Sequence, residues 1–129
     1  MYEMKEEYLT GIPQIDEEHT RIFELAEQAY QLLQDEHRYD KYDDLVYLVE
    51  ELKNYTKYHF QHEEEYMESI DYQAIFIQRV QHKDFIEKLD DFNIDEEDSE
   101  HEDTIIDLLN LITEWLIDHI LKMDKMIGQ

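Results

Sequence analysis

The chain has 129 residues, enough for one hydrophobic core, and this predicts a single domain over residues 1–129. Its 35 acidic and 11 basic residues give a formal net charge of −24, which argues against nucleic acid or anionic lipid as a partner. The absence of cysteine excludes disulfides, thiolate metal ligands and cysteine nucleophiles. Because no signal-peptide pattern and no apolar run of membrane-spanning length occur, we expect a cytoplasmic protein without a membrane partner.

Apolar residues recur at helical spacing in four segments, and the two glycines and one proline leave few breaks between them. The first segment has Asp16 as its expected N-cap and carries an apolar stripe over residues 15–33. Further stripes run over residues 45–67, 75–89 and 105–123. Four amphipathic helices joined by short links predict an all-α, antiparallel up-down-up-down four-helix bundle.

Each apolar stripe also carries a histidine, the second stripe carries a glutamate, and Asp124 lies five residues after His119. In the second segment His59 and Glu63 are one helical turn apart on the apolar face, so both side chains should point into the core. An unpaired buried carboxylate is costly, so a core glutamate beside a core histidine indicates a compensating cation. The other inward polar residues are His19, His82, His119 and Asp124. Four histidines, one per helix, with two acids at the same end of the bundle, favour a metal site over isolated structural histidines.

Other site types fit the sequence less well. A ferritin-like di-iron bundle needs two Glu-x-x-His pairs, and the nearest match is the single stretch "DEEH" over residues 16–19. The stretch "HEEEY" over residues 62–66 lacks the second histidine of a metalloprotease motif. A haem held by two core histidines would leave Glu63 and Asp124 buried without a cation. Mixed imidazole and carboxylate ligation suits iron, manganese or zinc.

Four motifs in order along the chain resemble the hemerythrin family in its bacterial form: "GIPQIDEEH", "HFQHEEEYM", "HKDF" and "WLIDHILKMD". The resemblance covers nearly the whole chain. It implies two non-haem iron ions inside a four-helix bundle, joined by carboxylate and oxo or hydroxo bridges. It also implies reversible binding of O2, and of related small ligands such as azide, peroxide or NO.

The same resemblance implies roles for individual residues. His19 and His59 would ligate the iron that takes O2, and His82 and His119 would ligate the second iron. Glu63 and Asp124 would bridge the two irons. The residues expected around an apolar O2 pocket are Phe60, Trp115 and Ile117, together with Phe23, although large apolar residues on these helices usually serve packing alone.

The step from His119 to Asp124 conflicts with ideal helix geometry. Five residues along an ideal α-helix place two side chains about 140° apart around the axis. We therefore expect a local distortion of the helix between these two residues.

Gln78 departs from the family pattern, which has a histidine four residues before His82. Losing that ligand would lower the affinity for the second iron or leave a single bound metal. Alternatively, it would open a second exchangeable position and favour oxidation or peroxide turnover. The sequence therefore predicts an O2-binding protein for storage, delivery or sensing, with a di-iron oxidase or peroxidase as the alternative. A bundle that has lost its metal and acts as an interaction module is a third hypothesis. We expect the remaining histidines, His37, His62 and His101, at the surface.

Overall fold

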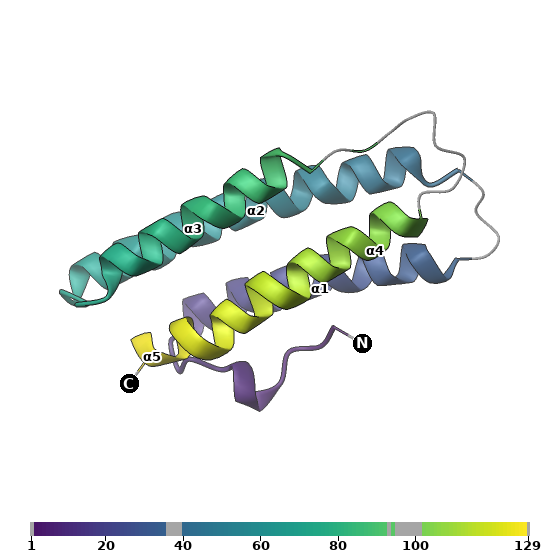
Figure 1. Ribbon diagram of the computed structural model, residues 1–129. Helices are drawn as coiled ribbons and strands as arrows, with labels where there is room; N and C mark the ends of the chain where they lie inside the picture. Colours follow the sequence, from purple (N-terminus) through teal and green to yellow (C-terminus); the bar gives the residue numbers. More distant parts are fainter. Residues whose placement is uncertain (1, 36–39, 93, 95–101, 129) are drawn as a thin grey trace.

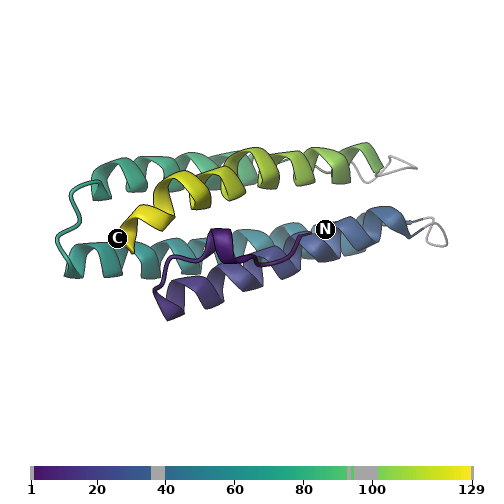
Figure 2. The same ribbon diagram turned by 90° about the horizontal axis from the view of Figure 1, so that it is seen from below.

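The computed structural model describes residues 2–35, 40–92, 94 and 102–128, and within these ranges it contains helices and no strand. The long helices are α1 (Pro13–Gln34), α2 (Tyr42–Ser69), α3 (Ile75–Asp90) and α4 (Glu102–Leu111), and a short 3₁₀ turn, η1 (Glu6–Tyr8), precedes them. α4 continues into the π-helical stretches η2 (Ile112–Ile117) and η3 (Ile120–Asp124) and ends in α5 (Lys125–Ile127). The helices lie side by side and alternate in direction (Figures 1 and 2), which confirms the predicted antiparallel four-helix bundle.

The first long helix begins earlier than predicted. α1 starts at Pro13, and its N-cap is Ile12, so the prediction of Asp16 as the N-cap is wrong. Proline is favoured at the first helical position because it lacks an N–H and its φ is already helical. The Asp16 carboxylate instead accepts hydrogen bonds from the backbone N–H groups of Thr10 (2.8 Å) and Gly11 (3.1 Å). Asp16 therefore ties the preceding segment to α1.

The hydrophobic core contains side chains from all four long helices and changes character along the bundle. Toward one end it is built from aliphatic side chains such as Leu45, Leu52 and Ile105, each at most 1% exposed. Toward the end where α2 turns into α3, the buried residues include histidines and carboxylates. Because α2 and α3 are antiparallel, the end of α2 and the start of α3 lie at the same level, as Figure 1 shows. α1 begins and η3 ends at that level too.

The expected distortion between His119 and Asp124 is confirmed as η3, a π-helical stretch. A π-helix widens each turn, so residues five apart approach the same face. The Nε2 atom of His119 lies 3.1 Å from Oδ1 of Asp124. The irregular helix thus directs both side chains into the bundle.

Within residues 2–35, 40–92 and 102–128, none of the helices combines the length and the apolarity needed to cross a bilayer.

Candidate metal centre

Six buried polar side chains meet between the four helices. Their exposed fractions lie between 0% and 5%, and they are His19, His59, Glu63, His82, His119 and Asp124. They form two overlapping sets of potential metal ligands, and within each set the ligand atoms lie within 4.8 Å of one another. One set contains His19 and His59, and the other contains His82 and His119. Glu63 and Asp124 belong to both sets.

Glu63 lies between the two histidine pairs. Its Oε2 atom is 3.2 Å from Nε2 of His59, and its Oε1 atom is 3.0 Å from Nε2 of His82. One carboxylate therefore presents an oxygen to each pair.

Asp124 has the same relation to the other two histidines. Its Oδ2 atom is 3.1 Å from Nε2 of His19, and its Oδ1 atom is 3.1 Å from Nε2 of His119. Two carboxylates, each facing both histidine pairs, have the arrangement that two metal ions with shared carboxylate ligands require.

The inward atoms of this cluster lack hydrogen bonds of good geometry. Buried atoms without a hydrogen-bond partner among the described residues include Nε2 of all four histidines, Nδ1 of His19, both carboxylate oxygens of Glu63 and Oδ2 of Asp124. A neutral imidazole nitrogen and a carboxylate oxygen are both acceptors, so their approach to about 3 Å needs a proton or a cation between them. Because buried polar atoms are rarely left unpaired, the donor set fits a divalent cation.

In three of the four histidines, the ring nitrogen that faces away from the cluster, Nδ1, donates a hydrogen bond to a neighbouring side chain. Nδ1 of His59 donates to Glu18 (2.9 Å), and Nδ1 of His82 donates to Glu64 (2.9 Å). These bonds fix the ring tautomer and leave Nε2 free to point into the cluster.

His119 follows the same pattern with a neutral partner, because its Nδ1 donates to the side-chain oxygen of Gln81 at 2.7 Å. Glu18, Glu64 and Gln81 were not predicted as partners of the histidines. The available signal was their position in the chain, next to residues of the cluster.

Several residues of the cluster have shifted pKa values. Burial lowers the pKa of His19, but contacts with Asp124 and Glu63 outweigh it and raise the value to about 9. The pKa of His82 rises to about 9 because Glu63 and Glu64 likewise outweigh burial. Burial raises the pKa of Glu63, but His59, His19 and His82 hold it well below its usual range. Without a metal ion, protons therefore compensate the buried carboxylates.

The chain matches the Hemerythrin HHE cation binding domain over residues 10–129. It belongs to the hemerythrin family. Among its hemerythrin relatives, the bacteriohemerythrin of Clostridium acetobutylicum is 39% identical over 97% of both chains. Bacteriohemerythrins of Pseudomonas paraeruginosa and Pseudomonas aeruginosa are 32% and 31% identical, over 89% of this chain and 71% of theirs. No solved structure matches the chain significantly.

Gln78, the departure from the hemerythrin pattern, lies in the buried cluster with 0% exposure. Its Nε2 donates a hydrogen bond to Oδ1 of Asp124 at 3.2 Å, and its Oε1 has no partner among the described residues. The amide thus contacts a carboxylate that belongs to both ligand sets. Gln78 therefore points into the bundle.

Aromatic rings pack on the second histidine pair of this hemerythrin bundle. Phe60 stacks on His82 with ring centroids 3.8 Å apart and an interplanar angle of 3°. Trp115 stacks on His119 at 4.9 Å and 14°. Phe23 is buried and Ile117 is half-buried against the core. The O2 pocket predicted around these residues stays a prediction.

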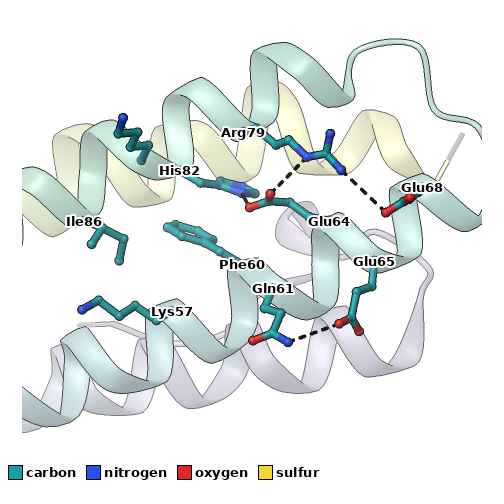
Figure 3. Close-up of a pocket in the computed structure, with 10 residues that line it drawn as sticks. Lys57, Phe60, Gln61, Glu64, Glu65, Glu68, Arg79, His82 and Ile86 are labelled. Atoms are coloured by element: carbon teal, nitrogen blue, oxygen red, sulfur yellow. Dashed lines mark hydrogen bonds and ion pairs between the residues drawn. The ribbon is translucent and has the colours of Figure 1, made fainter.

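A groove of about 500 Å³ lies between α2 and α3, beside His82. Figure 3 shows side chains that line it. Phe60, Glu64 and Arg79 are among the residues that line it. Trp115 and Ile117 are not, so this groove differs from the predicted O2 pocket.

His62 is less exposed than predicted. Its side chain is 25% exposed, and its Nδ1 donates to Glu18 at 2.7 Å. The Glu18 carboxylate, held between α1 and α2, draws the ring away from solvent. The two other histidines predicted at the surface, His37 and His101, lie outside the described residues.

Proposed function

We propose that this protein holds two non-haem iron ions and binds O2 reversibly, for storage, delivery or sensing. The proposal rests above all on two buried carboxylates, Glu63 and Asp124, that each face both histidine pairs. The names of its bacteriohemerythrin relatives support the same reading.

The six buried residues divide between the two proposed metal positions. His19 and His59 would hold the first ion, His82 and His119 would hold the second, and the two carboxylates would hold both. Two ferrous ions in such a site supply the electrons that reversible O2 binding draws on. Mixed nitrogen and oxygen ligation is appropriate for iron.

The surrounding side chains would protect the site from water. Phe60 stacks on His82 and Trp115 stacks on His119, so both rings cover the second histidine pair. The Phe60 ring also lies 5.8 Å from the ring of His59, at the position expected to take O2. We propose that Phe60, Trp115 and Ile117 wall the pocket that O2 enters. Excluding water limits proton delivery, and this favours release of O2 over its reduction.

Gln78 supports a second candidate function, a di-iron oxidase or peroxidase. It offers an amide where the family pattern has an imidazole, and an amide is the weaker ligand for iron. An open position beside the second ion would admit a substrate such as peroxide. A bundle without a metal function fits less well, because it would leave the six buried acids and histidines of the cluster without a cation.

The experiment that separates these functions is an O2 titration of protein loaded with ferrous iron under anaerobic conditions. Reversible binding predicts a visible absorption band that persists in O2 and disappears when O2 is removed. An oxidase or peroxidase predicts a transient band and continued consumption of O2 or peroxide. The absence of any band would contradict both functions.

A further inference from the structure

Glu18 is a buried carboxylate with two histidine partners. Its side chain is 6% exposed, its Oε1 accepts a hydrogen bond from Nδ1 of His59, and its Oε2 accepts one from Nδ1 of His62. These contacts hold its pKa below the usual range although burial raises it. Its negative charge thus lies directly behind one histidine of the first metal position, shielded from solvent.

The histidines of the second metal position have weaker hydrogen-bond partners behind them. Glu64 accepts from Nδ1 of His82, but its side chain is 27% exposed and it also pairs with Arg79 at 3.3 Å. Figure 3 shows Glu64 between His82 and Arg79. The other histidine of this position, His119, has only the neutral amide of Gln81 behind it.

The first position has one weakness, because Nδ1 of His19 has no hydrogen-bond partner among the described residues. The buried charge of Glu18 and the amide of Gln78 both favour tighter metal binding at the first position. A carboxylate that accepts a ligand's ring N–H orients that ring and makes the opposite nitrogen more basic. The effect of a buried carboxylate is screened little, whereas solvent and a guanidinium weaken the effect of Glu64. The second position also has Gln78 in place of an imidazole, which lowers its affinity further.

We propose that the two metal positions differ in affinity, that the position at His19 and His59 is the tighter one, and that Glu18 sets this order by positioning His59. The inference rests on the proposed function, because it takes two bound metal ions as given. It assigns Glu18 the part of a positioning residue, which acts through His59.

The test uses the full chain loaded with Co²⁺ and challenged with increasing EDTA. Native mass spectrometry counts the ions retained, and the visible bands of Co²⁺ report the coordination of each. We expect loss in two separate steps. His119→Gln should remove the weaker step alone, and His19→Gln should remove the tighter step alone, which assigns the steps to the two positions.

Glu18 variants then test the order of affinity. Changing an outer partner of a ligating histidine typically costs about 10–100-fold in metal affinity. We expect Glu18→Met to weaken the tighter step by an amount in this range. Glu18→Gln should weaken it less, because an amide oxygen still accepts the His59 N–H. A residue that only filled space would give Met and Gln the same small effect.

Two further variants complete the comparison. Glu64→Gln should weaken the second step and leave the first unchanged. Glu65→Gln, at an exposed position on the same helix, should change neither step. Far-UV circular dichroism checks that each variant keeps its helices. If Glu18→Met does not fold, Glu18→Gln still tests the proposal, with several-fold weakening of the tighter step expected.

The outcomes separate this inference from the proposed function. Two equal affinities, or a tighter step that Glu18→Gln leaves unchanged, would overturn the inference and leave the two-metal site intact. Failure of the natural protein to retain any Co²⁺ would overturn the proposed function itself.

Discussion

Gln78 donates a hydrogen bond from its side-chain amide to Asp124, at 3.2 Å, inside the buried cluster. The amide occupies the position where the family pattern places a ligating histidine. We predict that Gln78→His adds an imidazole ligand and tightens the second metal position by at least about tenfold, since even changes behind a ligand cost about 10–100-fold. Chelator competition on iron-loaded and cobalt-loaded protein measures this affinity.

The same substitution distinguishes a carrier from an enzyme. Closing an open position should slow autoxidation and lengthen the life of the oxygenated form. Gln78→Leu is the matched control, because it removes the amide without adding a ligand, and it should not tighten the second position. If the natural protein already holds both ions equally, and Gln78→His changes neither affinity nor oxygenation, Gln78 has no role in the chemistry.

Glu63 provides the sharpest test of a shared carboxylate. Glu63→Gln keeps the size and helical propensity of the side chain but removes the charge that faces both histidine pairs. Metal content should fall well below that of the natural protein while helicity persists. Glu65→Gln, two residues further along α2 and exposed, is the control and should keep full metal content. Full metal loading of Glu63→Gln would show that Glu63 is not a bridge.

Metal removal should destabilise the protein. A ligand present at a hundred times its Kd stabilises the native state by about 2.7 kcal/mol per site. For a chain of this size that corresponds to a Tm higher by roughly 10 °C. Thermal unfolding of metal-free and metal-loaded protein, followed by circular dichroism, measures the difference. Equal Tm values would contradict the buried site.

The stability of the metal-free protein should depend on pH. The pKa values of His19 and His82 rise from 6.5 to about 9 on folding, so the native state binds more protons between these values. Their stabilising contribution is complete below pH 6.5 and is lost as the pH rises through 9. The Tm of metal-free protein should therefore fall between pH 6.5 and 9.

The loaded protein should keep its Tm over the same range, because the metal occupies the nitrogens that would otherwise bind protons. A metal-free Tm that is constant between pH 6.5 and 9 would show that these histidines are not paired with the carboxylates.

Helical periodicity was sufficient to predict the bundle, because each long helix has a continuous apolar stripe such as the one over residues 45–67. The start of α1 was not predicted correctly. Aspartate is a residue type that often caps helices. The Asp16 carboxylate instead accepts hydrogen bonds from the backbone of Thr10 and Gly11, upstream of a helix that starts at Pro13. Capping depends on local backbone geometry, which residue type alone does not determine.

Glu63 and the four histidines of the cluster were predicted from their places on apolar helix faces, where an unpaired charge is costly. The step from His119 to Asp124 was implied by the family resemblance, because periodicity alone does not place Asp124 on that face. The side chains behind the histidines were not found. Glu18 shares the buried face of α1, three residues after Ile15 and four before Ile22, but its partner His59 is 41 residues away in the chain. Partial burial of His62 likewise reflects its contact with Glu18. Such contacts depend on how α1 and α2 pack together.

The number of iron ions that the natural protein binds tests the central claim most directly. Native mass spectrometry of protein reconstituted with ferrous iron without oxygen should show two ions per chain, one for each set of ligands around Glu63 and Asp124. A chain that binds no iron, or that binds it equally well when Glu63 is replaced by glutamine, would contradict the account.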